Sequence, residues 1–119
     1  MGRDIERGFM IDWARIQELH EEIGAEAFAE VIDLFLLEID SAVESIRTSP
    51  DQERLEMTLH FLKGGVLNLG FTEMATLCHE GERLAAQGRS AQVDVDAILL
   101  AYQSARHCLV TETGQRIGQ

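Results

Sequence analysis

Apolar residues recur every three or four positions along most of the chain, which is the spacing that buries one face of an α-helix. In the longest such segment, from about Ala25 to Thr48, the apolar face consists of Phe28, Val31, Ile32, Phe35, Ile39, Ala42, Val43 and Ile46. Four further amphipathic segments follow the same period, near residues 12–23, 50–70, 72–88 and 94–113. Strict alternation of apolar and polar residues, which indicates β-strands, never persists. The pattern therefore predicts an all-α protein.

Residues that start and stop helices stand at the ends of these segments. Side chains able to cap a helix N-terminus begin three of them: Asp12, Ser49 and Thr72. Pro50 suits a first helical position, and Gln52 completes a capping box with the serine. Glycines that end a helix follow three of the segments: Gly24, Gly70 and Gly88. The connections are short, so consecutive helices are expected to pack antiparallel.

These signals predict one domain, an antiparallel up-down four-helix bundle with an additional short N-terminal helix. Residues 1–10 are expected to form a loose lead-in, residues 11–113 the bundle, and residues 114–119 a frayed tail. The chain of 119 residues is long enough to bury a core without disulfides or metal. We expect a monomer, and the initiating methionine and short tail favour a stand-alone protein over a piece of a larger kinase.

The net charge of −11 excludes nucleic acids and anionic membranes as natural partners, because both attract basic surfaces. The N-terminus lacks the apolar core of a signal peptide, and no apolar run is long enough to cross a membrane. Cys78 and Cys108 show no metal-binding or redox spacing and are expected to be reduced thiols. These features predict a cytoplasmic protein.

The segment around His60 carries the most informative chemistry. Its apolar face consists of Leu55, Leu59, Leu62, Val66 and Leu69. At 100° per residue, His60 points roughly 140° away from the middle of that face. Lys63 and Gly64 follow one turn later and neighbour the histidine. Gly64 and Gly65 each cost the helix about 1 kcal/mol relative to alanine, which indicates a need for close backbone approach.

A neutral imidazole is a good nucleophile near pH 7, so His60 is a candidate carrier of a phosphoryl group. Lys63 would neutralise charge on the phosphoryl oxygens, and Gly64 would leave room for a second protein. On the same outward side, three apolar residues accompany Gly64 as a candidate docking patch: Met57, Phe61 and Leu67. The alternative interpretation is a solvated histidine among scattered surface residues.

His79 and Glu82, three residues apart, share a face of the following helix. Counting back from the turn at Gly70, Glu82 lies about as far along its helix as His60 does along the preceding one. The two side chains could therefore meet across the groove between the helices. A carboxylate that accepts the Nδ1 proton leaves Nε2 free to attack. The alternative is an ordinary half-exposed helical pair.

The series His60-x-Leu62-Lys63-Gly64, closed by Asn68-Leu69-Gly70, resembles the signature of the histidine phosphotransfer (HPt) domain family of bacterial two-component phosphorelays. This resemblance implies a four-helix bundle whose His60 accepts a phosphoryl group from a receiver aspartate or a histidine kinase and passes it to a receiver aspartate. The expected partners are response-regulator receiver domains and a sensor histidine kinase, and the magnesium ion would belong to the receiver. No cofactor is expected on this chain.

The four residues His60, Lys63, His79 and Glu82 are also similar to the site in the phosphotransfer domain of chemotaxis-type histidine kinases. There, as the resemblance implies, the carboxylate orients the phosphorylated histidine, while the lysine and second histidine tune it. The chain departs from the family at Gly65, where serine is common. It departs again at Gly81, where a large aliphatic residue is usual. Gly81 suggests either a closer helix contact or a small void near the site.

Competing functions lack their residues. A di-metal carboxylate bundle needs Glu-x-x-His on two helices, and this series occurs nowhere in the chain. The chain contains no Gly-x-x-x-x-Gly-Lys loop, which is the loop that would bind ATP. We therefore expect it to have no enzymatic activity without a partner. His20 and His107 stand outside any such arrangement and are expected to be packing or surface residues. The remaining alternative is an unphosphorylated adaptor that binds signalling partners through the same face.

Overall fold

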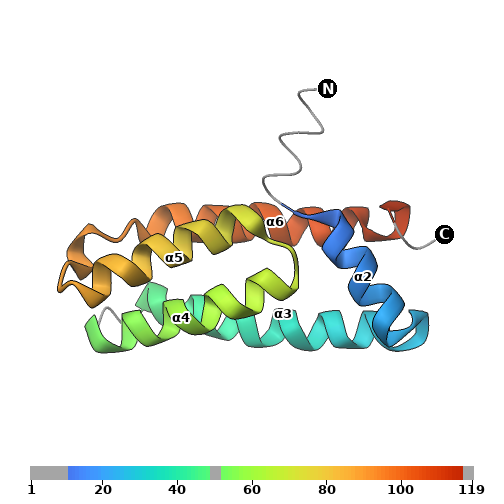
Figure 1. Cartoon of the computed structure of the whole chain (residues 1–119), viewed down its shortest axis with the longest axis horizontal. Coiled ribbons are helices and arrows are strands. Elements are labelled where there is room, and N and C mark those ends of the chain that lie inside the picture. The colour runs from blue at the N-terminus through green and yellow to red at the C-terminus, as the bar shows by residue number, and fades with distance from the viewer. Residues whose placement is uncertain (1–10, 49–51, 117–119) are drawn as a thin grey trace, which may run out of the picture.

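The computed structural model describes residues 11–48 and 52–116, and these residues are almost entirely helical (Figure 1). The elements in order are α2 (Trp13–Ile23), α3 (Ala25–Thr48), α4 (Gln52–Asn68), α5 (Thr72–Ala86), the 3₁₀ turn η1 (Ser90–Gln92) and α6 (Val95–Arg116). No strand occurs within these described ranges. The prediction of an all-α protein is therefore confirmed.

Aspartate side chains cap two of the helices, as predicted for Asp12 and without a prediction for Asp94. The Asp12 carboxylate accepts hydrogen bonds from the backbone N–H groups of Ala14 and Arg15 at 3.1 and 3.4 Å. The Asp94 carboxylate accepts one from the N–H of Ala97 at 3.0 Å. Gly24 ends α2 with a φ of 87°, a conformation that a side chain would disfavour. The cap predicted from Ser49 and Pro50 lies outside the described residues, as do residues 1–10 and 117–119.

Two predicted boundaries differ from the structure. Thr72 is the first residue of α5 and not its cap; Phe71 stands at the cap position, with its ring fully buried. Burial of this ring fixes where the chain turns, and it outweighs the local preference for a capping hydroxyl. The last helix continues past Thr113 to Arg116. Glycine at position 114 lowers helix propensity but does not by itself end a helix.

The helices α3 to α6 lie lengthwise beside one another, and α2 crosses the end of the molecule where α3 begins (Figure 1). The most extensive packing joins α4 to α5, while α3 packs against both α4 and α6. The whole predicted stripe of α4 is buried: Leu55, Leu59, Leu62, Val66 and Leu69. Because this face is held in the core, the opposite face of α4 is left at the surface.

The turn between α4 and α5 is held by the chain that leads into α2. The backbone N–H of Asp12 donates to the carbonyl of Gly70 at 2.6 Å, and Ile11 is buried beside it. Gly70 has a φ of 70°, and a Cβ at this position would lie 2.7 Å from the carbonyl oxygen of Asp12. The glycine therefore permits both the turn and the contact. This contact helps to fix α5 relative to α4.

A polar cluster joins α3 to α6 on the other side of the bundle. The carboxylate of Asp40 accepts hydrogen bonds from the Tyr102 hydroxyl and from Arg106, whose Nε and Nη2 lie 3.0 and 2.9 Å away. Burial by itself would raise the pKa of Asp40, but the hydrogen bonds from Arg106 and Tyr102 outweigh it and lower that pKa. The amphipathic pattern alone gave no sign that these three residues meet.

None of the helices in the described ranges combines the length and apolar character that a membrane crossing requires.

Candidate functional site

The exposed face of α4 presents His60 beside α5. Its side chain is 70% exposed, whereas the neighbouring Leu59 and Leu62 are fully buried. The ring nitrogen Nδ1 lies 2.6 Å from Oε2 of Glu82, which is 20% exposed. The expected meeting of these two side chains across the groove is therefore present in the structure.

This contact selects one tautomer of the imidazole. The hydrogen bond from Lys63 is the largest influence on Glu82 and lowers the pKa of its carboxyl; burial opposes this effect, and the bond to His60 adds to it. An ionised carboxylate only accepts hydrogen bonds, so the proton of a neutral His60 ring is on Nδ1. The lone pair is then on Nε2, in a side chain that is exposed enough for another molecule to reach it.

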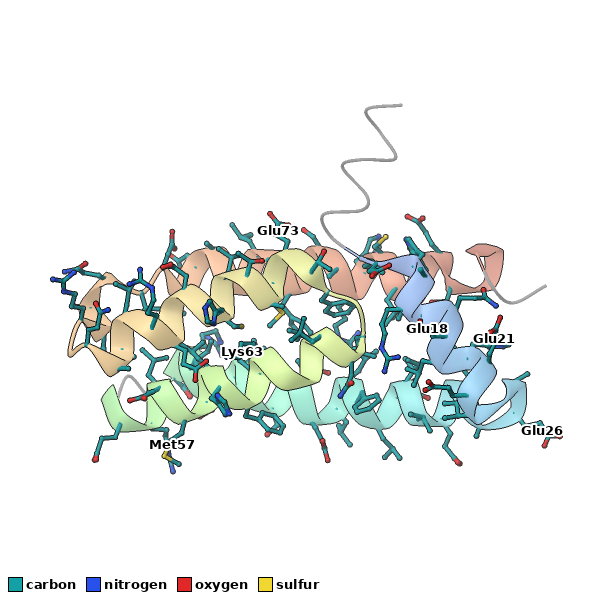
Figure 2. The ribbon with its side chains drawn as sticks, viewed as in Figure 1. Glu18, Glu21, Glu26, Met57, Lys63 and Glu73 are labelled. Carbon is teal, nitrogen blue, oxygen red and sulfur yellow. The ribbon has the colours of Figure 1, made fainter. Side chains whose placement is uncertain are left out.

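Lys63 lies between the carboxylate and the second histidine. Its Nζ is 2.9 Å from Oε1 of Glu82 and 3.5 Å from Nδ1 of His79. Figure 2 shows this side chain between α4 and α5. An ammonium group can only donate, so Nδ1 of His79 accepts and its own proton is on Nε2. In this contact Nδ1 of His79 accepts, whereas Nδ1 of a neutral His60 donates to Glu82.

Gly64 leaves the approach to the ring open. A Cβ built on Gly64 would meet nothing within 4 Å. A Cβ on Gly65 would touch the Ile39 side chain of α3 at 3.6 Å, an ordinary van der Waals distance. Neither glycine is therefore required by close packing within the chain. Any need for small size at Gly64 must come from outside it.

Apolar side chains flank the histidine on the exposed face. Met57, Phe61 and Leu67 are 71%, 49% and 51% exposed. Met57 points away from the bundle (Figure 2). A shallow groove between α3 and α4 has Met57 and Phe61 on one side and Ser41 of α3 on the other. A second groove runs between α4 and α5, where Leu67 and Lys63 face Thr76 and His79.

Sequence reasoning missed the contribution of α3 to this face. Leu34 and Leu37 are 59% and 66% exposed, although both are large apolar residues. They fall outside the core stripe of α3, one turn before the residues that line the groove beside Phe61. Their position on a helical wheel was the signal that could have identified them.

The remaining candidate groups are inert or distant. His20 packs its ring edge against Phe28 with 5.0 Å between the ring centres, and His107 is exposed on α6. Cys78 and Cys108 are buried and form no disulfide. Burial raises the pKa of Cys78 to about 12, so its thiol stays protonated at neutral pH. Among the described residues, no group of histidine, cysteine or acidic side chains is arranged to hold a metal ion.

A family model described as the Hpt domain matches residues 30–114, well over half of the chain and every residue of this site. The chain therefore belongs to the Hpt domain family, whose members act in histidine phosphotransfer within the phosphorelays of two-component signalling. Searches of curated proteins and of solved structures found no match.

Proposed function

We propose that this chain is a phosphocarrier whose phosphoryl group is attached to Nε2 of His60. The observation that carries the proposal is the 2.6 Å contact between Nδ1 of an exposed histidine and the Glu82 carboxylate. This contact keeps the attacking nitrogen unprotonated and accessible. A histidine that served only as a surface residue would have no need of such a partner.

In the proposed reaction, Nε2 of His60 attacks the phosphorus of an aspartyl phosphate on a receiver domain. The new N–P bond forms while the P–O bond breaks, and its electron pair leaves with the aspartate carboxylate. The ring becomes a phosphorylated imidazolium that keeps its proton on Nδ1, and Glu82 stabilises the positive charge of that ring. Donation to a second receiver is the reverse of these steps. A sensor histidine kinase is the other possible donor.

Lys63 has two roles in this proposal. Its ammonium lies 2.9 Å from Glu82, so it keeps the carboxylate ionised and in place. It also follows His60 by one turn on α4, where its charge can offset that of the transferred phosphoryl oxygens. His79, whose Nδ1 is 3.5 Å from that ammonium, limits the positions that Lys63 adopts. The magnesium ion of the reaction belongs to the receiver, and we propose no cofactor for this chain.

The proposed docking surface for the receiver consists of Gly64, Met57, Phe61 and Leu67. These residues surround His60 on the exposed face of α4, and three of them expose large apolar side chains. Apolar groups around a polar reacting atom exclude water as the partner seats, which favours transfer over hydrolysis. The open space at Gly64 lets the partner's aspartyl phosphate come within reach of Nε2.

The scaffold that we propose for this activity is an antiparallel up-down four-helix bundle of α3 to α6, with α2 added at one end, acting as a monomer. The short turn around Gly70 and the extensive α4–α5 packing support it. Cys78 and Cys108 form no disulfide, which is consistent with work in the reducing cytoplasm.

The decisive experiment incubates the purified chain with a panel of receiver domains carrying labelled phosphate and with autophosphorylated kinase cores. We expect label on this chain that is lost in acid and retained in base, which distinguishes phosphohistidine from esters of serine and from aspartyl phosphate. Mass spectrometry under basic conditions should place the phosphoryl group on His60. If no donor labels the chain although receivers bind it, the adaptor alternative replaces the carrier.

A further inference from the structure

Gly81 is the most crowded helical glycine of the described residues that has no positive φ. It is buried in α5, and a Cβ at this position would lie 3.0 Å from Cδ1 of Leu59 and 3.1 Å from Cγ1 of Val93. Both distances are tighter than ordinary van der Waals contact, which begins near 3.5 Å between carbon atoms. The missing side chain therefore lets α5 approach Leu59 of α4 more closely than any other residue would allow.

The position of this contact links it to the site. Leu59 precedes His60 on α4, and Gly81 precedes Glu82 on α5. The contact of Leu59 with Gly81 therefore sets the separation of the two helices at the level where Nδ1 of His60 meets Oε2 of Glu82. That hydrogen bond, at 2.6 Å, is slightly shorter than the range of about 2.7–2.9 Å that is usual for charge-assisted bonds from nitrogen. A larger separation of the two helices would therefore weaken this hydrogen bond.

We propose that Gly81 is a positioning residue, which holds α5 close enough to α4 for Glu82 to orient the ring of His60. The expected effect of Gly81 on phosphotransfer rests on the proposed phosphocarrier function. Its expected effect on the contact between His60 and Glu82 does not. A methyl group at this position forces Leu59 or the helix axis to move by a few tenths of an ångström. The core around Leu59 and Ile98 is fully buried and close-packed, so part of that movement passes to the helix separation.

Two competing effects oppose this expectation. Alanine is a better helix former than glycine, so Gly81→Ala could stabilise α5 and leave the site unchanged. The Glu82 side chain is flexible and could follow the ring without loss of the hydrogen bond. The experiment therefore has to measure the state of the ring and not only the stability of the fold.

The test compares Gly81→Ala with the wild-type chain by two measurements. Nitrogen NMR of the imidazole ring, above the pH at which the ring loses its positive charge, reports the share of His60 that carries its proton on Nδ1. We expect this share to fall in Gly81→Ala. Phosphotransfer from a labelled receiver should slow by roughly three- to tenfold at saturating receiver, because a small misplacement of a catalytic group lowers the rate steeply. The receiver concentration for half-maximal rate should not change, since the docking face lies on the other side of α4.

A second substitution shows which neighbour of the new methyl group transmits its effect to the site. In Gly81→Ala combined with Leu59→Val, the Cδ atom that meets the new methyl is gone, and we expect the ring tautomer and the transfer rate to recover. In Gly81→Ala combined with Val93→Ala, only the contact of the new methyl with Val93 is relieved. Neither the ring tautomer nor the transfer rate should then recover. Gly65→Ala is the matched control, because it adds a methyl on the α3 side of α4 at an ordinary contact of 3.6 Å. It should leave both measurements unchanged.

The outcomes separate this inference from the proposed function. A normal tautomer and a normal rate in Gly81→Ala would overturn the positioning role while the carrier function stands. Recovery with Val93→Ala but not with Leu59→Val would also overturn it. If the wild-type chain takes no label but its ring tautomer responds to Gly81→Ala, the positioning role stands and the carrier function fails. If Gly81→Ala alone does not fold, the double variant with Leu59→Val still tests the proposal. A double variant that folds but loses the Nδ1 proton would contradict it.

Discussion

Two polar clusters join neighbouring helices in this molecule, and they differ in whether a reactive group is left without a partner inside the protein. In the α3–α6 cluster, both oxygens of Asp40 are taken by Arg106 and Tyr102. In the α4–α5 cluster, both oxygens of Glu82 are also taken, by His60 and Lys63, but the ring of His60 keeps a free nitrogen and a 70% exposed surface. The first cluster closes on itself, and the second ends in an open nucleophile.

The difference shows how to tell a structural cluster from a reactive one when both contain the same residue types. A cluster that serves stability satisfies each of its donors and acceptors within the protein. A reactive cluster satisfies all groups except the one that must meet a partner, and it places that group at the surface. Substitutions in each cluster can test this distinction.

Replacing the open nucleophile should abolish function without affecting the fold. His60→Gln should take no phosphoryl label from any donor that labels the wild-type chain. Its free energy of unfolding should change by no more than about 0.5 kcal/mol, because the exposed ring buries little surface. Autoradiography measures the label, and urea unfolding followed by circular dichroism measures the free energy of unfolding. His107→Gln, another exposed histidine, is the control and should label normally; persistent label in His60→Gln would refute the assignment of the site.

Closing the approach to the nucleophile should block transfer while the bundle stays folded. Gly64→Gln places a long side chain where a Cβ now meets nothing within 4 Å, so the fold should be unchanged or stabilised by up to about 1 kcal/mol. Transfer from a labelled receiver should fall by about a hundredfold, because the reacting atoms no longer come into contact. Gly64→Ala should cause a smaller loss. Transfer at the wild-type rate in Gly64→Gln would show that no partner approaches over this glycine.

Removing the groups that orient the ring should give graded losses. Glu82→Ala should slow transfer by about tenfold, the usual cost of losing a partner that orients a reactive imidazole. His79→Ala should matter less, since His79 acts only through Lys63. Glu80→Ala, which removes an exposed carboxylate paired with Arg83 on the same helix, is the matched control. Single-turnover kinetics rank the three variants, and a larger effect at His79 than at Glu82 would contradict the proposed roles.

Opening the structural cluster should have the opposite outcome. Asp40→Asn weakens the contacts to Arg106 and Tyr102 and should lower the free energy of unfolding by about 1 kcal/mol, a modest value because solvent screens this half-exposed ion pair. Phosphoryl labelling of His60 should be unchanged. Asp33→Asn, at an exposed aspartate of the same helix, should leave stability unchanged. Loss of labelling in Asp40→Asn would mean that the two clusters are coupled through α3.

The smallest predicted effect is the pH dependence of that stability difference. The pKa of Asp40 is lower in the folded chain than its ordinary value of 3.8. A lowered native pKa means that the stabilisation is fully present above pH 3.8 and is lost as the pH falls through the native pKa. The melting temperatures of wild type and Asp40→Asn should therefore differ at pH 5 to 7 and converge in stronger acid. A difference that grows in acid would have the wrong sign and would refute the assignment.

Much of the fold and of the site could be predicted from local patterns. The stripe of α4 placed His60 on the exposed face, because the direction of a side chain around a helix depends only on its position in that helix. The contact of His60 with Glu82 followed from counting residues on both sides of the short turn at Gly70. Asp12 was identified as a cap because the capping interaction lies within three residues.

Contacts between separate helices were harder to predict, because they depend on how each helix is rotated and shifted against its neighbour. The cluster of Asp40, Tyr102 and Arg106 joins residues more than sixty positions apart, and no local signal links them. The start of α5 was misplaced because the buried ring of Phe71 decides it, and that burial depends on the whole core.

The sequence by itself therefore determined the helical class, the outward direction of His60 and the residues that could act on it, since each follows from a period of 3.6 residues or a short turn. Only the tertiary structure decided that Gly81 makes a close helix contact and does not leave a void. It also decided that Glu82 approaches His60 to 2.6 Å and that Lys63 bridges Glu82 and His79. The physical reason is that distances between helices come from the packing of the whole core, to which every buried side chain contributes.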